Sequence, residues 1–467
     1  MGAGIAQVAA RAGHRVVVVD AADAALARGS AVVGKALTMA VERGVISQGD
    51  AEAAASRINW SSAIEDIAGA ALVIEAIVEQ LGAKIGLLRS LAAIVSPEAV
   101  LASNTSSLSI DAIAAEVPAP GRVIGLHFFN PVPAMKLVEV VPGSRTEPVV
   151  RDDMIALMST WGKRPVAVRD VPGFIVNRVA RPYYAEAFAA LEEGIAPETI
   201  DHALTSCGGF RMGALALSDL IGQDVNCAVA RSIHHAYAGR TRFRPQPAQA
   251  ALVEAGRLGR KTGGGVFDYA GDSRRPCFAP PGPAPRSIKV SAQGGTSVKL
   301  FREAGLVCRE DADLPYGFVS VDGTLLAMTD GRPLSARDDV DVLADVARDF
   351  AVANMIVLTA RDDAAAAAIA GLVQATGRSA LFIPDRPGMI VLRTLAQLAN
   401  AAADAVADEV APVAAIDEAM VYGANHPEGP LHWAERAGRT RVATALANIA
   451  DTTGDEQYRP AELLARP

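Results

Sequence analysis

The sequence predicts an α/β fold of the doubly wound type at the N-terminus, followed by helical segments, on three observations. The chain has 467 residues, enough for roughly three domains of about 150 residues each. Short apolar runs alternate with helical spacing over the first 170 residues, as parallel βαβ units require. The C-terminal residues repeat an earlier helical stretch, which indicates a duplicated module.

The first elements are a helix and then a strand. Residues 3–12 are small and favour a helix, Gly13-His14 predicts a turn, and residues 16–19 form a β-branched run typical of a buried parallel strand. In a doubly wound fold that helix should follow a first strand, and no such strand precedes it here. We therefore expect that the first strand is missing, through a start codon assigned too late or a shortened chain.

Further strands are predicted from apolar runs, and helices lie between and after them. The strands are expected at 71–75, 99–103, 122–126, 136–141 and 165–168, with a helix over 84–94. One long helix is expected over 174–193, and helical segments continue to about residue 258. A Pro-rich stretch over 276–285 predicts a linker, and residues 286–383 return to short strands.

The last segment is an internal repeat of the helical one. VPGFIVNRV (171–179) matches RPGMIVLRT (386–394), and EEGIAPETIDHAL (192–204) matches ADEVAPVAAIDEAM (407–420) with one inserted residue. A third block, 209–222, matches 425–438 in the same order. Chance similarity between Ala-rich helices would not keep three blocks in order together with the Pro-Gly and Ala-Pro pairs.

Composition excludes several classes of protein. The chain is 51% hydrophobic and 21% charged, which is globular, and its net charge of -8 argues against general nucleic-acid binding. Four widely spaced cysteines without a C-x-x-C motif suggest no disulfide framework and no metal site. No apolar run approaches 18 residues and no signal peptide is evident, so we expect a cytoplasmic protein without a membrane span.

Two features near the N-terminus fit a dinucleotide site weakly. Gly2 stands where the third glycine of a G-x-G-x-x-G fingerprint would lie, at the start of a helix whose N-terminus would hold a pyrophosphate. Asp20 follows the next strand, where an acidic residue would bind the ribose hydroxyls of NAD. A flexible terminus and a strand-end cap explain these residues equally well.

The segment GLHFFNPVPAMKLVEVV (125–141) is more specific. His127 ends one predicted strand, Glu139 lies in the next, and Asn130-Pro131 forms the turn. A carboxylate that holds one imidazole nitrogen fixes the tautomer and makes the other nitrogen more basic, so His127 could take a proton from a substrate hydroxyl. Taken alone, the pair is better explained by a core histidine and a surface glutamate.

Together with IEAIVEQLGAK (74–84), SNTSSLSI (103–110), PGFIVNRV (172–179) and GRLGRKTGGGVFDY (256–269), this segment resembles the L-3-hydroxyacyl-CoA dehydrogenase family. The resemblance covers residues 1 to about 270. The whole chain is similar to the longer bacterial 3-hydroxybutyryl-CoA and 3-hydroxyadipyl-CoA dehydrogenases, which suggests β-oxidation or phenylacetate catabolism. It implies an NAD-dependent enzyme that acts on an acyl-CoA substrate.

The resemblance implies a role for each matching residue. His127 would be the catalytic base and Glu139 its partner, while Ser106 and Asn177 would lie beside the reacting oxygens. The residues that it places at the cofactor are Gly2, Asp20, Glu79, Lys84, Ser106, Asn130 and Lys261. The repeat has Leu392 where the first copy has Asn177, so the second module would be structural.

The expected segments are an NAD-binding Rossmann-like domain (1–170), a helical module (171–270), a linker (271–285), a degenerate α/β segment (286–383) and a second helical module (384–467). Shorter members of the family dimerise through the helical module, so the two modules should pack together as an internal pseudo-dimer, with further homo-oligomers possible. Two alternatives remain open at this point. One is a non-catalytic relative of the same fold, and the other is a β-hydroxyacid dehydrogenase with a lysine base.

Overall fold

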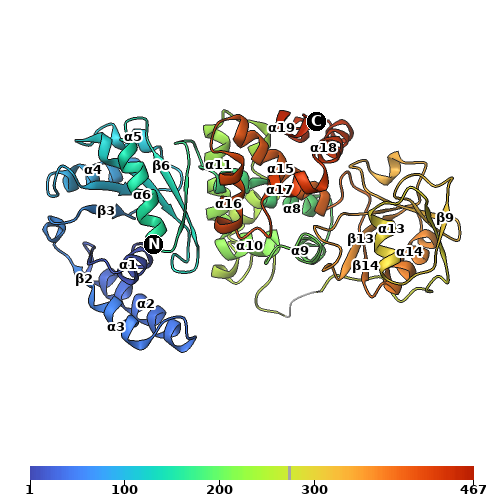
Figure 1. The fold of residues 1–467 in the computed structure, drawn as a ribbon, viewed down its shortest axis with the longest axis horizontal. Helices are drawn as coiled ribbons and strands as arrows, with labels where there is room; N and C mark the ends of the chain where they lie inside the picture. Colours follow the sequence, from blue (N-terminus) through green and yellow to red (C-terminus); the bar gives the residue numbers. More distant parts are fainter. Residues whose placement is uncertain (272–274, 467) are drawn as a thin grey trace. The chain divides into compact units, whose positions relative to one another are not determined.

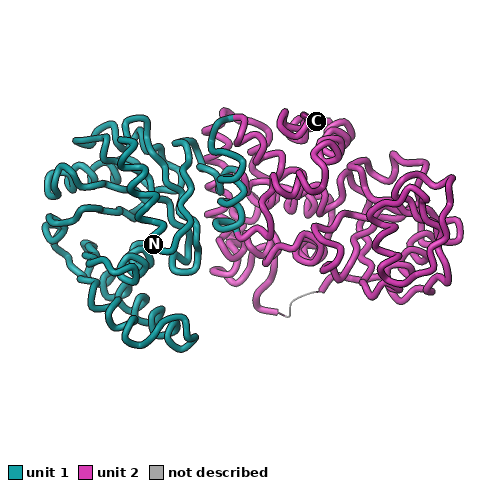
Figure 2. The backbone as a smooth tube through the Cα atoms, in the orientation of Figure 1, with its two compact units in different colours: residues 1–178, 408–424 teal, residues 179–407, 425–467 magenta. Residues whose placement is uncertain are grey.

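The computed structural model describes residues 1–271 and 275–466, which fall into two compact units (Figures 1 and 2). Unit 1 contains residues 1–178 and 408–424, and unit 2 contains residues 179–407 and 425–467. The segment 408–424 belongs to the predicted second helical module, yet it folds with the N-terminal α/β domain. The compact units therefore do not follow the order of the chain.

The strands of unit 1 form two sheets. β1 (Val16–Val19) pairs in parallel with β2 (Ile58–Ser61). The second sheet has the order β3-β4-β5-β6-β7 and is parallel except between β5 and β6. Its strands are β3 (Leu72–Glu75), β4 (Val100–Ser103), β5 (Val123–Phe128), β6 (Leu137–Pro142) and β7 (Arg164–Ala167). All the predicted strands of this region are present, and β2 was missed because Asn59 and Ser61 interrupt its apolar run.

Helices surround these sheets. They are α1 (Gly2–Arg11), α2 (Asp23–Glu42), α3 (Gln48–Ser56), α4 (Leu81–Ala92), α5 (Ile110–Ala114), α6 (Pro148–Thr160), α7 (Val176–Val179) and α16 (Val413–Gly423). Ile5 and Val8 of α1 join the core formed by β4, β5 and β6, and α16 packs against β6 and β7. By length and composition alone α2 could cross a membrane, a test that helices of soluble proteins also pass.

Most of unit 2 is helical, and one predicted helix is divided. The expected continuous helix over 174–193 is broken into α7 and α8 because Pro182 has no amide hydrogen for the turn before it. The helices of this unit are α8 (Arg181–Glu192), α9 (Pro197–Ser206), α10 (Ala214–Ile221), α11 (Gln223–Ala236), α12 (Pro247–Glu254), α13 (Thr296–Glu303), α14 (Asp363–Ala375), α15 (Val391–Ala407), α17 (Pro430–Ala437), α18 (Arg439–Thr453) and α19 (Glu462–Ala465).

Unit 2 also contains a seven-stranded sheet of order β14-β13-β12-β11-β10-β8-β9. Its strands are β8 (Ile288–Ser291), β9 (Cys308–Asp311), β10 (Val319–Val321), β11 (Thr324–Met328), β12 (Val342–Ala344), β13 (Met355–Ala360) and β14 (Ser379–Phe382). α13 and α14 cover it, with Phe301 and Ile369 in the shared core. The expectation of short strands in this segment is confirmed, although β11 and β12 were not predicted.

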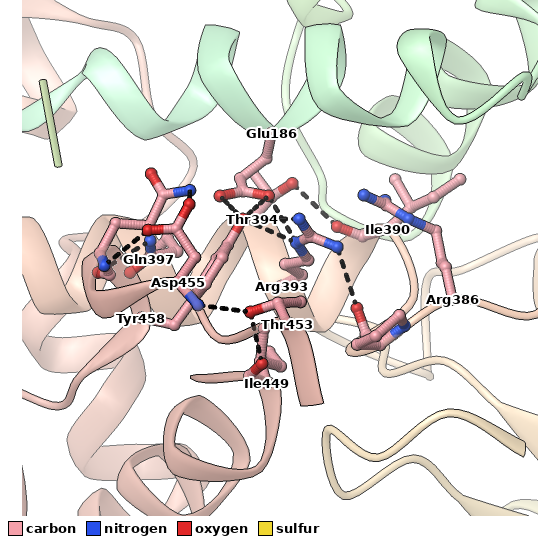
Figure 3. A network of polar contacts seen from close by, with 12 residues as sticks. Glu186, Arg386, Ile390, Arg393, Thr394, Gln397, Ile449, Thr453, Asp455 and Tyr458 are labelled. Carbon is pink, nitrogen blue, oxygen red and sulfur yellow. Dashed lines mark hydrogen bonds and ion pairs between the residues drawn. The ribbon is translucent and has the colours of Figure 1, made fainter. Parts of the chain in front are cut away.

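Within unit 2, helices from the two halves of the repeat lie against each other. α8 packs on α15, and a buried polar network joins them (Figure 3). Arg393 Nε lies 2.7 Å from Glu186 Oε2, and the Tyr458 hydroxyl lies 2.6 Å from Arg393 Nη2 and 3.0 Å from Glu186 Oε1. Since each charged group has a partner, the network stabilises the contact between α8 and α15 instead of leaving a charge unpaired.

His426 is a further buried titratable group of unit 2, and it predicts how stability depends on pH. Its imidazole lies among the rings of Phe210 (5.1 Å) and Tyr183 (5.9 Å), and burial lowers its pKa to about 3. An unfolded histidine has a pKa of about 6.5, so the unfolded chain binds a proton in the window between 6.5 and 3 that the folded chain refuses. The free energy of unfolding must therefore fall as the pH drops.

We expect this group to cost unit 2 roughly 2 kcal/mol of stability between pH 7 and pH 5, as linkage requires for a histidine held neutral. His426→Gln should flatten that part of the pH dependence in urea unfolding. His235→Gln, which changes an exposed histidine, serves as the control and should leave the dependence as it is in the unsubstituted protein. Equal pH dependence in both variants would contradict the assignment.

Candidate active site

The antiparallel register of β5 and β6 sets His127 directly opposite Glu139. Cross-strand neighbours share one face of the sheet, so the two side chains meet. His127 Nδ1 lies 2.6 Å from Glu139 Oε2, the histidine is 7% exposed and the glutamate is fully buried. The sequence could place the two residues on neighbouring strands, and the register supplies the contact.

The other oxygen of Glu139 binds the backbone that leads into α7. Oε1 accepts hydrogen bonds from the amides of Ile175 (2.9 Å) and Val176 (3.0 Å). The carboxylate is therefore fixed at both oxygens and has no freedom to rotate. With Glu139 ionised, a neutral His127 donates through Nδ1–H, which leaves Nε2 as a proton acceptor.

Aromatic side chains enclose the imidazole. The ring of Phe129 lies 4.4 Å from that of His127, and the ring of Phe174 lies 5.8 Å away. Phe174 itself has a positive φ of 47°, and Gly173 before it has 77°. Two successive left-handed residues turn the chain sharply, which brings the ring and the two amides back toward β6.

Asn177 and Ser106 lie together beside this pair. Asn177 Nδ2 donates to the backbone oxygen of Ser106 over 3.4 Å. The Ser106 amide in turn donates to Glu79 Oε1 over 2.9 Å, and the side chain of Ser106 is partly open. The predicted quartet of His127, Glu139, Ser106 and Asn177 is thus contained within unit 1.

Glu79, which lies between β3 and α4, binds the loop after β4 through its carboxylate. Its Oε1 also accepts from the hydroxyls of Thr105 (2.7 Å) and Ser107 (3.0 Å). Burial opposes the ionisation of Glu79, but these hydrogen bonds and the charge of Lys84 outweigh burial and lower its pKa. Glu79 is therefore ionised at neutral pH and organises the loop that presents Ser106.

Lys84 is more buried than a lysine that contacts a cofactor phosphate directly would be. Its ammonium is 1% exposed, lies 3.0 Å from Glu75 Oε1 and 3.3 Å from Glu79 Oε2, and Glu75 also accepts a hydrogen bond from Ser103. The structure thus gives Lys84 the task of holding Glu75 and Glu79. Sequence reasoning missed Glu75, although its position at the end of β3 was a usable signal.

Two more residues fix the site and were not foreseen. Asn104 Oδ1 accepts from the amide of Phe128 over 2.8 Å, which ties the end of β5 to the loop after β4. Lys163 Nζ donates to the carbonyl of Met135 over 2.7 Å and to that of Val132, and burial lowers its pKa to about 8. Lys163 therefore clamps the turn between β5 and β6, a role that no sequence pattern indicates.

The predicted cofactor residues fit NAD where the structure places them in unit 1. The first amides of α1, at Gly2, have no side-chain cap, which leaves them free to bind phosphate oxygens. Asp20 is exposed at the end of β1, where a carboxylate suits ribose hydroxyls. Asn130 is exposed and precedes Pro131 in a cis peptide. Lys261 lies in unit 2, where it pairs with Asp224 at 2.5 Å.

Comparison with known proteins decides the family. Residues 1–171 match the family domain described as "3-hydroxyacyl-CoA dehydrogenase, NAD binding domain". Residues 173–269 and 388–466 match the C-terminal domain of the same family. The chain belongs to the 3-hydroxyacyl-CoA dehydrogenase family. It is accordingly an NAD-dependent oxidoreductase that converts a 3-hydroxyacyl-CoA to the 3-ketoacyl-CoA.

Individual relatives agree with this family. The chain is 40% identical to 3-hydroxyadipyl-CoA dehydrogenase of Escherichia coli, over 99% of this chain and 94% of the relative. A crystal structure described as 3-hydroxybutyryl-CoA dehydrogenase from Escherichia coli has a TM-score of 0.89 and covers 99% of this chain and 95% of that one. The pig mitochondrial hydroxyacyl-coenzyme A dehydrogenase is 39% identical over 58% of this chain and 88% of the relative.

The α/β segment of unit 2 has an arrangement that parallels the catalytic one. β12 pairs antiparallel with β13, and β13 pairs in parallel with β14, as β5, β6 and β7 do. In this register Asp345 follows β12 opposite Val357, at the position that His127 has opposite Glu139. Asp345 accepts from the amides of Ile390 (2.9 Å), Val391 (2.7 Å) and Leu392 (2.9 Å).

The second α/β segment therefore keeps the contact between a buried carboxylate and the next helix, but it has no histidine there. Gly388 and Met389 repeat the positive φ values of Gly173 and Phe174. With a carboxylate in place of the imidazole and Leu392 in place of Asn177, this segment has no counterpart of His127 or of Asn177.

The pair of Lys84 with Glu75 predicts a large loss of stability on substitution. Lys84→Met leaves the buried Glu75 without its partner, which should lower the free energy of unfolding by about 3–5 kcal/mol. Urea unfolding measures this loss, and NADH binding should weaken because Glu79 loses its anchor. Lys35→Met, at an exposed lysine of α2, is the matched control. A loss below about 1 kcal/mol, typical of surface pairs, would contradict the buried-pair interpretation.

Proposed function

We propose that His127 is the general base of the reaction and that Glu139 orients it. The observation that supports this assignment is the 2.6 Å contact between Nδ1 and the buried carboxylate. His127 Nε2 accepts the proton of the substrate C3 hydroxyl, and Glu139 stabilises the imidazolium that forms. In the reductive direction the same nitrogen returns the proton.

NAD, when bound, supplies the hydride acceptor of the reaction. The uncapped amides of α1 at Gly2 and the carboxylate of Asp20 would hold it, with Glu79 organising the loop that contains Ser106. Ser106 and Asn177 hydrogen-bond the reacting oxygens of the substrate. The phenyl rings of Phe129 and Phe174 keep water from the imidazole, which strengthens its interaction with Glu139.

We propose a short-chain substrate or one with a terminal carboxylate on the acyl group. The relatives that support this range are described as 3-hydroxyadipyl-CoA and 3-hydroxybutyryl-CoA dehydrogenases. Cytoplasmic location and a place in β-oxidation or phenylacetate catabolism follow from the same likeness. The contact of α8 with α15, which belong to different copies of the repeat, supports an internal pseudo-dimer of the helical modules.

A non-catalytic relative of the same fold remains the competing interpretation. It would not require the histidine, the glutamate, the serine and the asparagine to remain together in one unit. The degenerate segment of unit 2 illustrates the opposite case, because there the histidine and asparagine positions contain Asp345 and Leu392. The lysine-base alternative finds no support at the site, since Lys163 is held by two backbone carbonyls.

His127→Gln should reduce the rate of NADH oxidation with acetoacetyl-CoA by about 10²- to 10⁴-fold, which is the usual contribution of a general base. Binding of the CoA ester should remain largely intact, which shows that the loss is chemical. His14→Gln, at an exposed histidine of the same unit, is the matched control and should keep full activity. If His127→Gln retains turnover, His127 is not the general base.

The acyl preference can be tested by comparing kcat/KM for acetoacetyl-CoA and 3-oxoadipyl-CoA with NADH. We expect kcat/KM for acetoacetyl-CoA or for 3-oxoadipyl-CoA to exceed that for a long-chain 3-ketoacyl-CoA by at least about tenfold, because a long acyl chain needs additional space in the binding site. Equal kcat/KM for a long-chain ester would contradict the proposed substrate range.

A further inference from the structure

The segment 408–424 raises a question that the catalytic quartet does not answer. It comes from the second helical module, which has lost the catalytic asparagine, yet it folds into unit 1 beside the active site (Figure 2). Its helix α16 packs on β6, the strand of Glu139, and on β7. The guanidinium of Arg164 on β7 lies 5.6 Å from the ring of Tyr422.

The element next to this segment is α7, the single helical turn that contains Asn177. A helix of four residues has no stability of its own, so its position depends on tertiary contacts. The residues on both sides of Asn177 make such contacts with 408–424. Arg178 Nη2 pairs with Asp408 Oδ2, and Val176 packs against Gly423 so closely that a Cβ there would lie 2.9 Å from Val176 Cγ2.

These contacts lead directly to the catalytic pair. The amide of Val176 is one of the two that fix Glu139 Oε1, and the side chain of Asn177 reaches the Ser106 backbone. Arg178 is 1% exposed, so its charge needs an acidic partner, and Asp408, whose side chain is 35% exposed, supplies one. A second link, from the Arg169 amide to the Val410 carbonyl (3.0 Å), fixes the start of the same segment.

We propose that Asp408 is a positioning residue for the reaction, acting through Arg178 on α7 and so on Glu139 and Asn177. The segment 408–424 then supports the reaction at the first copy of the repeat, although it belongs to the second copy, which has Leu392 at the position of Asn177. This inference rests on the proposed role of His127 and Glu139.

The repeat offers a matched control. Glu193 and Arg393 stand at the positions of Asp408 and Arg178 in the other copy, at the same spacing of about 215 residues. Arg393 Nη1 lies 3.4 Å from Glu193 Oε1 (Arg393 is labelled in Figure 3), and Glu193 also binds Arg386 at 2.6 Å. This pair is within unit 2, at the start of α15, which has Leu392 at the position of Asn177. Its loss should affect stability but not the reaction.

The test compares Asp408→Asn, Asp408→Glu and Glu193→Gln in the full chain. For Asp408→Asn we expect kcat with acetoacetyl-CoA and NADH to fall about tenfold while KM changes less than twofold, because catalysis is sensitive to small displacements. Asp408→Glu should recover most of kcat, since a glutamate serves in the other copy. Glu193→Gln should keep kcat.

A second measurement does not depend on turnover. NMR titration of labelled histidine rings follows His127, identified by the peak that His127→Gln removes. When the amides bind Glu139 less firmly, its carboxylate attracts the imidazolium proton more strongly, so the titration curve of the ring should differ between Asp408→Asn and the unsubstituted protein. The curve should not change in Glu193→Gln.

Unchanged kcat and an unchanged titration curve in Asp408→Asn would overturn the inference, and so would an equal loss of kcat in Glu193→Gln. If the unsubstituted enzyme fails to oxidise NADH, the proposed function is wrong, and the His127 titration still decides the positioning role. If Asp408→Asn does not fold, Gly423→Ala tests the same path, because it keeps every charge and its new Cβ would press on Val176 and on Leu137 of β6, the strand of Glu139. That variant should show the same fall in kcat and a changed titration curve.

Discussion

The active site depends on one buried carboxylate. Glu139 binds the imidazole of His127 with one oxygen and the amides of Ile175 and Val176 with the other. Those three contacts join β5, β6 and the entry to α7, so they hold His127, Glu139 and the turn that leads to Asn177 together. A buried carboxylate is stable only when its hydrogen bonds are satisfied, which makes each of these contacts a condition for the others.

A second layer of charge keeps the opposite side of the site in place. Lys84 holds Glu75 and Glu79, and Glu79 gathers the hydroxyls and amides of the loop after β4. Ser106 is thus presented by a loop whose order comes from a fully enclosed ammonium. The residues that the family likeness placed at the cofactor divide accordingly into exposed groups, such as Asp20, and supporting groups, such as Lys84.

Much of this could be predicted from the sequence, for physical reasons. Alternating apolar runs gave most strands, and the resemblance identified His127, Glu139, Ser106 and Asn177. Long-range contacts could not be predicted in the same way. Nothing in the order of residues indicates that Lys163 clamps the turn after Pro131, or that 408–424 folds with residues 1–178. β12 was missed because its apolar run is only three residues long, and β2 was missed because polar residues interrupt it.

Asp345 shows which contact is present in the α/β segment that has no histidine at the position of His127. It takes the register position of the histidine, yet it performs the structural half of the work of Glu139 by binding the amides of the helix that follows. In both segments the following helix therefore begins at amides that a buried carboxylate binds, whether the acid lies on β6 or directly after β12. The anchor of this helix thus depends on a buried carboxylate and not on the strand that supplies it, and the segment without a histidine keeps that anchor.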